Sequence, residues 1–298
     1  MPSLSAARQS NATFSPATPP VAIFIGGTSG IGQGTAQAFA SHVKGNAHII
    51  LVGRNRAAAE AIIATFPKHD NSDYEFVHCD ASLIRNIPET TSALLARLPK
   101  VNYLVLTCGV LPSVGDILRG VRHFTDEGLD MVLELAFYAR VKFVSDLLPL
   151  LQKAKDAGED ARVLNVAAAG HGGPIDLDDM GLRRTDGPKT VRPTLATYTD
   201  VVTETFAARV PGSSFIHSYP GTVSTPIFPW WMRPLTKLLC TSVDDCGEYM
   251  LYALLNGGEG AQRVGEHGDD LGSKGYFGGD EVRDKVWAHA MEVIDSAL

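Results

Sequence analysis

The chain has 298 residues, of which 45% are hydrophobic and 20% are charged. This composition is typical of a globular protein that buries a sizeable core, and it argues against a disordered chain. The 26 basic and 33 acidic residues give a formal net charge of −7 without a basic cluster, which argues against a nucleic-acid partner.

The opening segment, residues 1–20, is rich in Ser, Ala, Pro, Asn and Thr and has no apolar core. We expect a disordered N-terminal tail there that is neither a signal peptide nor a membrane anchor. No apolar run approaches the roughly 18 residues that a membrane-spanning helix requires. The four cysteines lack Cys-x-x-Cys spacing, which argues against a zinc site or a disulfide framework. We therefore expect a cytoplasmic protein with no metal and no membrane partner.

Short apolar runs alternate with helix-length segments along the rest of the chain. Strands are predicted at 21–25, 48–52, 74–79, 103–107, 162–166 and 215–219, with a last short strand around 275–277. Helices are predicted at 32–43, 55–66, 88–98, 126–155, 193–210, 243–256 and 280–297. Such alternation indicates crossover units and a parallel sheet, and strands that are apolar throughout are typical of a sheet covered on both faces. The sequence predicts one doubly wound α/β domain over residues 21–298, with about seven parallel strands.

A glycine-rich turn joins the first predicted strand to the first predicted helix, and it reads Gly26-Gly27-Thr28-Ser29-Gly30-Ile31-Gly32. Glycines at this spacing let the backbone approach a pyrophosphate, while the helix N-terminus offers N–H groups and a positive dipole end. The strand–turn–helix context raises the match above a chance loop. A tight turn without a ligand is the alternative.

The spacing Gly26-x-x-x-Gly30-Ile31-Gly32 resembles the motif of the short-chain dehydrogenase/reductase family, and the resemblance continues to about residue 277. It implies a Rossmann fold that binds a nicotinamide cofactor. In that family an Asp at the position of Gly53 favours NAD, and an Arg just after it favours the 2′-phosphate. Arg54 therefore implies NADP(H), because a guanidinium can grip a phosphate bidentately. The cofactor-binding residues that the resemblance implies are Gly26, Thr28, Ser29, Gly30, Ile31, Gly32, Arg54, Asn55, Asp80, Ala81, Cys108, Gly109, Pro220, Gly221, Val223 and Thr225.

The residues that carry catalysis in that family, a tyrosine, a lysine, a serine and an asparagine, are not found here. Ala136 falls at the asparagine position and Ala168 at the serine position, while Tyr198 has Val202 where the lysine would be. Counting back from Pro220-Gly221 places the tyrosine position nearer 189–192, and the lysine is absent on either alignment. A tyrosine without this lysine keeps a pKa near about 10 and is a poor acid and base at neutral pH.

Three other side chains are candidates for catalysis. Arg140 lies four residues after Ala136, hence on the same helix face, where it is expected to bind an anionic or carbonyl oxygen unless it is a surface or interface arginine. His171 and Asp176 follow the fifth predicted strand, at the edge of the sheet where ligands bind. His171 is a proton donor or a structural histidine, and Asp176 pairs with Arg140 or holds a substrate cation.

The segment 228–233, Phe-Pro-Trp-Trp-Met-Arg, lies where the family carries its substrate lid, at about 222–240. Adjacent tryptophans in a loop indicate a bulky apolar or aromatic substrate, an oligomer contact or core packing. The resemblance also implies a homodimer or homotetramer, formed through the two long helices.

The sequence favours an NADPH-dependent reductase of secondary metabolism that delivers hydride to a bulky iminium or conjugated carbonyl without the Ser-Tyr-Lys triad. Fungal natural-product members of the family with similarly altered triads are iminium reductases, and some guide a cycloaddition; the segments 137–140 and 211–217 resemble that branch. Two alternatives are a non-redox cyclase or isomerase, such as a Diels-Alderase that uses NADP structurally, and a non-catalytic NADP(H)-binding protein.

Overall fold

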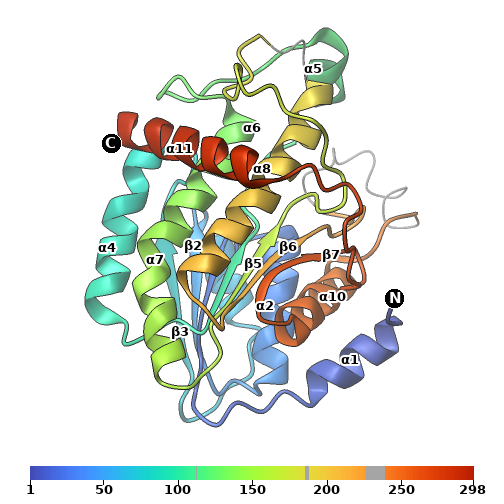
Figure 1. Cartoon of the computed structure of the whole chain (residues 1–298). Helices are drawn as coiled ribbons and strands as arrows, with labels where there is room; N and C mark the ends of the chain where they lie inside the picture. The colour runs from blue at the N-terminus through green and yellow to red at the C-terminus, as the bar shows by residue number, and fades with distance from the viewer. Residues whose placement is uncertain (112, 185–187, 226–238) are drawn as a thin grey trace.

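The structure, a computed structural model, describes all residues except 112, 185–187 and 226–238 (Figure 1). Its centre is a seven-stranded parallel sheet with the order β3-β2-β1-β4-β5-β6-β7. The strands are β1 (Val21–Ile25), β2 (His48–Gly53), β3 (Asp73–His78), β4 (Tyr103–Leu106), β5 (Arg162–Val166), β6 (Ser214–Ser218) and β7 (Gly260–Val264). The strand order reverses direction between β1 and β4, which in such sheets opens a crevice at the carboxyl ends of the strands. The predicted doubly wound fold is confirmed.

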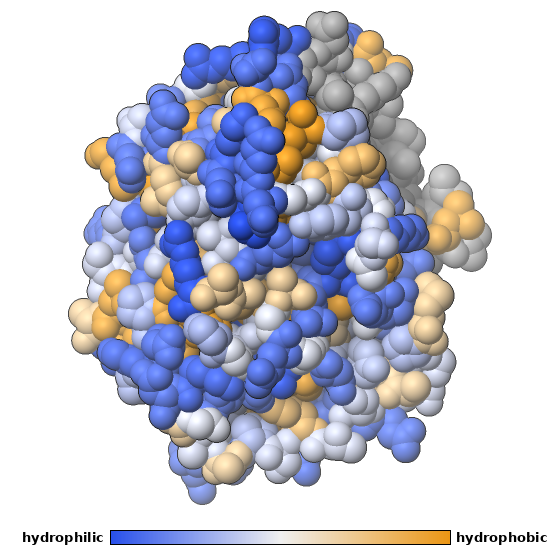
Figure 2. All heavy atoms as spheres, viewed as in Figure 1, coloured by the Kyte–Doolittle hydropathy of each residue, from blue (hydrophilic) through white to orange (hydrophobic). Residues whose placement is uncertain are grey.

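Helices cover both faces of the sheet, as the apolar strands predict. They are α1 (Leu4–Ala12), α2 (Gly30–His42), α3 (Arg56–Ile63), α4 (Ile87–Arg97), α5 (Val114–Arg119), α6 (Met131–Leu133), α7 (Ala139–Asp156), α8 (Pro188–Arg209), α10 (Val243–Asn256) and α11 (Asp280–Ser296), with a 3-10 turn η1 (Ile84–Asn86) and a π-helical segment η2 (Glu134–Tyr138). One buried cluster packs α2, α3 and α10 on one face, and another packs α4, α7, α8 and α11 on the opposite face. The face seen in Figure 2 is mainly hydrophilic, with apolar residues in patches between the polar ones.

The N-terminal segment differs from the mobile tail that the sequence predicts. Residues 4–12 form α1, in which Ser3 accepts a capping hydrogen bond from the N–H of Ala6. Asn11 is fully buried against α10, where its side-chain amide donates to the backbone oxygen and the carboxylate of Glu248. The prediction is wrong for these residues because the polar segment docks on α10 through such bonds and needs no continuous apolar face.

Two other predicted elements are displaced. The last strand lies at Gly260–Val264 and not around 275–277, because this edge strand mixes polar and small residues and so lacks the apolar run used to find strands. The single helix predicted over 126–155 begins only at Met131, after Asp130 caps it with hydrogen bonds from the N–H groups of Val132 and Leu133. Ser242 caps α10, since its hydroxyl accepts from the N–H of Asp245.

The helix α11 lies across α8 near the carboxyl end of that helix. The Trp287 and Phe206 rings meet edge to face, with centroids 5.5 Å apart. The dimer or tetramer expected through the two long helices stays a prediction, and α11 leaves less of α8 free for such a contact. Within the described residues, no helix is long and apolar enough to cross a bilayer.

Candidate active site

The glycine-rich turn is a tight backbone cradle between β1 and α2. Gly26 has a φ of 88°, in the region that favours glycine, and a Cβ there would lie 2.8 Å from the Cys108 backbone nitrogen. A Cβ on Gly32 would lie 2.5 Å from the Gly26 carbonyl oxygen, so α2 approaches the turn more closely than a side chain permits. Thr107 fixes this geometry from β4, because its hydroxyl donates to the carbonyl oxygens of Ile25 and Gly26.

A cavity of about 370 Å³ lies over this turn and the N-terminus of α2. Ser29, the N-cap residue, makes no side-chain capping bond, so its side chain satisfies none of the first-turn N–H groups of α2. Such groups and the positive end of the helix dipole are suited to a phosphate. Twelve of the sequence-predicted cofactor residues line this cavity: Gly26, Thr28, Ser29, Gly30, Ile31, Gly32, Arg54, Asp80, Ala81, Cys108, Gly109 and Thr225. The donor set and the glycine cradle fit a dinucleotide.

The ends of β2 and β3 bring one positive and one negative side chain to the same rim of this cavity. Arg54 is 65% exposed, and its guanidinium lies 3.8 Å from the carboxylate of Asp80. Asp80 is oriented by Ser82, whose backbone N–H and hydroxyl both donate to it. Asn55, also predicted to bind cofactor, lines neither this cavity nor the larger one described next. Its side chain instead caps α3 by accepting from the N–H of Ala58.

A second cavity of about 690 Å³ adjoins the first, and the two share Ile31, Thr107, Gly109 and Thr225 as lining residues. The remaining predicted cofactor residues, Pro220, Gly221 and Val223, line this second cavity. Ala136 and Ala168, which the resemblance aligns with the family asparagine and serine, line it too and present methyl groups to the space beside the smaller cavity. The predicted lid segment 228–233 lies outside the described residues.

Arg140 is buried, with 4% of its surface exposed, at the floor of the second cavity. Its guanidinium donates to the carbonyl oxygens of Cys108, Leu135 and Val166 and to the side-chain oxygen of Asn165. These bonds tie the carboxyl ends of β4 and β5 to η2, and none of these partners is acidic. Burial lowers the pKa of Arg140 from its usual value. The predicted pairing with Asp176 is wrong, because Arg140 points inward to backbone oxygens.

The two other catalytic candidates, His171 and Asp176, line neither cavity. Asp176 lies on an exposed loop, where its carboxylate is 3.5 Å from the guanidinium of Arg184. His171 bonds through Nδ1 to the carbonyl oxygen of Ala169 and packs on the Tyr219 ring, with centroids 4.3 Å apart. His171 therefore supports a residue that lines the larger cavity.

Tyr198, which stands where a Tyr-x-x-x-Lys pair would begin, points away from both cavities. It is fully buried, and its hydroxyl donates to the carbonyl oxygen of Met180 at 2.9 Å. Burial raises the pKa of Tyr198 far above its usual value, which makes this phenol a poor acid at neutral pH.

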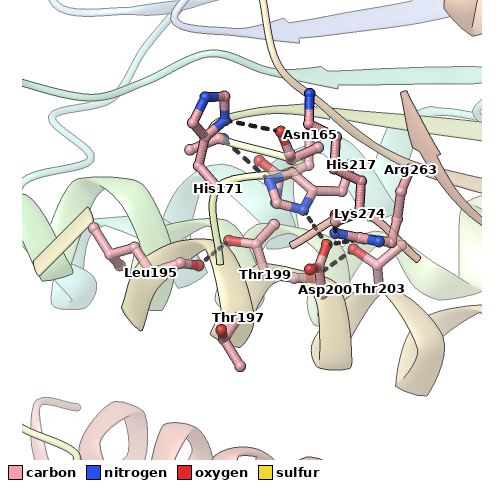
Figure 3. A network of polar contacts seen from close by, with 12 residues as sticks. Asn165, His171, Leu195, Thr197, Thr199, Asp200, Thr203, His217, Arg263 and Lys274 are labelled. Carbon is pink, nitrogen blue, oxygen red and sulfur yellow. Dashed lines mark hydrogen bonds and ion pairs between the residues drawn. The ribbon is translucent and has the colours of Figure 1, made fainter. Parts of the chain in front are cut away.

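A buried polar network, absent from the sequence prediction, fixes the cavity wall at Ala168 (Figure 3). The N–H of Ala168 donates to Nε2 of His217 at 3.1 Å. His217 bonds through Nδ1 to Asp200 at 2.6 Å, and Arg263 donates to the same carboxylate oxygen at 2.9 Å. Because Nε2 accepts a bond, His217 is neutral, and burial lowers its pKa in agreement with this. The residues lie on four separate segments of the chain, so sequence spacing gave no signal for the network.

Two further features near the site were also missed. Arg192, near the start of α8, lines the larger cavity, and its guanidinium carbon lies 5.5 Å from the centroid of the Tyr219 ring. Glu134 in η2 is fully buried, and neither of its carboxylate oxygens has a hydrogen-bond partner among the described residues. Burial raises the pKa of Glu134 to about 9, so this side chain is a neutral acid at neutral pH.

Comparison with known proteins identifies the family to which this fold and glycine-rich turn belong. The sequence model of the short chain dehydrogenase family matches residues 20–173. An oxidoreductase of Emericella nidulans is 32% identical over 229 residues, which are 76% of this chain and 66% of that protein, slightly less than two thirds. The short-chain dehydrogenase/reductase SAT2 of Stachybotrys chartarum is 30% identical over 285 residues, which are 85% of this chain and 77% of that protein.

A solved structure, that of L-sorbose reductase from Gluconobacter frateurii complexed with NADPH and L-sorbose, has a similar fold. Its TM-score is 0.57 at 18% identity, and the match covers 80% of this chain and 90% of that one. An identity this low shows a shared fold alone.

Proposed function

Because this chain belongs to the short-chain dehydrogenase/reductase family, we propose that it is an NADPH-dependent reductase of a bulky apolar substrate that works without the Ser-Tyr-Lys triad. The observation that carries the proposal is the pair of adjoining cavities. The smaller has the glycine cradle of a dinucleotide site, and the larger presents Ala136 and Ala168 where the family has polar catalytic groups. Hydride transfer requires only the cofactor and a well-placed electrophile, and NADPH supplies the hydride when it is bound.

The choice of NADPH over NADH rests on the rim beside β2. Gly53 has no side chain there to repel a phosphate, and Arg54 is exposed at the edge of the cavity. A guanidinium binds a phosphate through paired hydrogen bonds. We infer that Arg54 holds the 2′-phosphate, while Asp80 orients the guanidinium from the opposite side.

The charges in the larger cavity favour a conjugated carbonyl over an iminium as the group that is reduced. Arg140 and Arg192 both line this cavity, and neither forms an ion pair with a described residue. Two unbalanced positive charges repel a cationic iminium. They stabilise the negative charge that grows on a carbonyl oxygen when hydride adds to the conjugated double bond. The resulting enolate takes its proton from water, since no acidic side chain stands at the family positions.

The test measures loss of NADPH absorbance with two small probes, the enone benzylideneacetone and an N-methyl dihydroisoquinolinium salt. We expect NADPH oxidation with the enone, slower or no oxidation with the iminium salt, and transfer of deuterium from NADPH labelled at the nicotinamide. A chain that does not bind NADPH contradicts the proposal. Conversion of the natural substrate with no change in the oxidation state of the cofactor would instead establish the non-redox cyclase or isomerase.

A further inference from the structure

The larger cavity combines apolar walls with a positive charge that no carboxylate in the described part of the chain balances. Its apolar lining includes Val110, Leu111, Met131, Val132, Val191 and Leu195. Its volume of about 690 Å³ lies within the range of cavities that bury drug-sized ligands. The apolar walls favour a substrate with a bulky hydrocarbon skeleton, and the charged groups of the lining favour a particular polar substituent on that skeleton.

Most charged groups that line this cavity are neutralised by a neighbour. Arg122 lies 2.8 Å from Asp130, and the carboxylate of Asp116 lies 3.3 Å from His123, which balances it only when the imidazole is protonated. Arg192 differs from them, because its contact within the described residues is with the face of Tyr219 and not with a carboxylate.

The stack beneath Arg192 holds its guanidinium at the cavity wall. Tyr219 is half-buried and lines the cavity, with the His171 ring on it at 4.3 Å and the guanidinium carbon of Arg192 at 5.5 Å. Such a contact restrains a flexible side chain without using its N–H donors. None of the five N–H groups of Arg192 has an acceptor among the described residues, so they suit a planar anion, which a guanidinium binds bidentately.

We propose that the substrate of this cavity carries a carboxylate on its bulky apolar skeleton, and that Arg192 binds this carboxylate. The inference rests on the proposed function, in which the larger cavity is the substrate site beside the cofactor. Arg140 contributes to it as a buried positive charge, and Arg192 is the specific partner. The pyrophosphate of the cofactor is the competing anion, because Pro220 and Gly221 line the same cavity.

The experiment uses the full chain saturated with NADPH and two fluorescent probes of one skeleton, pyrenebutyrate and the uncharged pyrenebutanol. Fluorescence anisotropy gives the dissociation constant of each probe. We expect the carboxylate to bind about tenfold more tightly than the alcohol, the ratio produced by one charge-assisted contact. Arg192→Gln should remove most of this preference while leaving the affinity for the alcohol unchanged, and Arg192→Lys should keep more of it. The matched control is Arg184→Gln, which removes an exposed positive charge outside both cavities.

Three results would overturn the inference. The first is equal affinity of the wild type for the two probes, and the second is failure of both probes to bind. The third is weaker NADPH binding by Arg192→Gln with an unchanged probe preference, which assigns the guanidinium to the cofactor. Failure of the wild type to bind NADPH contradicts the proposed function instead, and the probe preference measured without cofactor then still tests the role of Arg192.

Discussion

Replacing Arg54 should change cofactor preference more than overall cofactor affinity. The guanidinium is 65% exposed and lies 3.8 Å from Asp80, so it can turn toward a phosphate without leaving a buried charge unpaired. Charge-assisted hydrogen bonds contribute about 1.5 to 3 kcal/mol, and solvent screening at this exposed rim favours the lower value. Arg54→Gln should therefore weaken NADPH binding about tenfold. In Arg54→Glu, repulsion between the new carboxylate and the phosphate adds about 1 kcal/mol, a further fivefold or so.

The assay is a fluorescence titration of NADPH and of NADH into each variant at low and high salt. NADH lacks the 2′-phosphate, so its affinity should stay within about twofold, and added salt should narrow the NADPH difference because the contact is exposed. The matched control is Arg56→Glu, since Arg56 is 64% exposed two residues away and pairs with Glu60. Equal losses of NADPH and NADH in Arg54→Glu, or equal losses of NADPH in the Arg54 and Arg56 variants, would refute the phosphate role.

Three further substitutions test the interior of the domain. Tyr198→Phe should still oxidise NADPH, and it should lose only the hydrogen bond to Met180, which lowers the free energy of unfolding by about 1 kcal/mol. Loss of turnover in a folded variant would place the phenol in catalysis. Asp200→Asn removes the buried negative charge that His217 and Arg263 share and should lower the unfolding free energy by about 3 kcal/mol in urea denaturation. An unchanged midpoint would contradict the network. Glu134 has a folded pKa of about 9 against an ordinary 4.5, so the stability it confers in its neutral form is lost as the pH rises between these values. Glu134→Gln should therefore be more stable by up to about 3 kcal/mol at pH 7 and equal in stability at pH 4, and parallel pH profiles of the two proteins would show that Glu134 is ionised in the fold.

The sheet could be predicted where burial on both faces leaves a continuous apolar run. The first six predicted strands agree with the observed ones to within one residue at either end, although β3 is a partly exposed edge strand that was found from Tyr74, Phe76 and Val77. The glycine turn could be placed because a tight backbone has few sequence solutions. The strand β7 could not be found this way, since an edge strand has less burial and tolerates Gln262 and Arg263. The helix α1 escaped prediction because its docking depends on a hydrogen bond from Asn11 to a helix that lies more than two hundred residues later.

In the catalytic half of the proposed site, the sequence predicts which side chains are missing but not where the remaining polar side chains point. Alanines at 136 and 168 are visible in the sequence, but the direction of a long polar side chain depends on packing. Arg140 does share a helix side with Ala136, yet its guanidinium bonds to the carbonyl oxygens of Cys108 and Val166 at the carboxyl ends of two strands. His171 is in the expected loop, but it packs on the ring of Tyr219, which belongs to another segment of the chain.

The positive charges around the larger cavity relate two proposals, reduction without the Ser-Tyr-Lys triad and binding of an anionic substrate. In a reductase with a tyrosine donor, a lysine beside the phenol lowers the pKa of the tyrosine and also holds the cofactor ribose. That lysine is then the positive charge nearest to the substrate. In this chain the positive charge comes from Arg140 beneath the cavity and Arg192 at its wall, on two different helices. A cation held by backbone oxygens cannot donate a proton, but it lowers the energy of an oxyanion that forms above it. In the proposed mechanism this positive potential stands in place of a proton donor and also favours an anionic substrate, so loss of the Arg192 charge should weaken carboxylate binding while the buried Arg140 continues to support reduction.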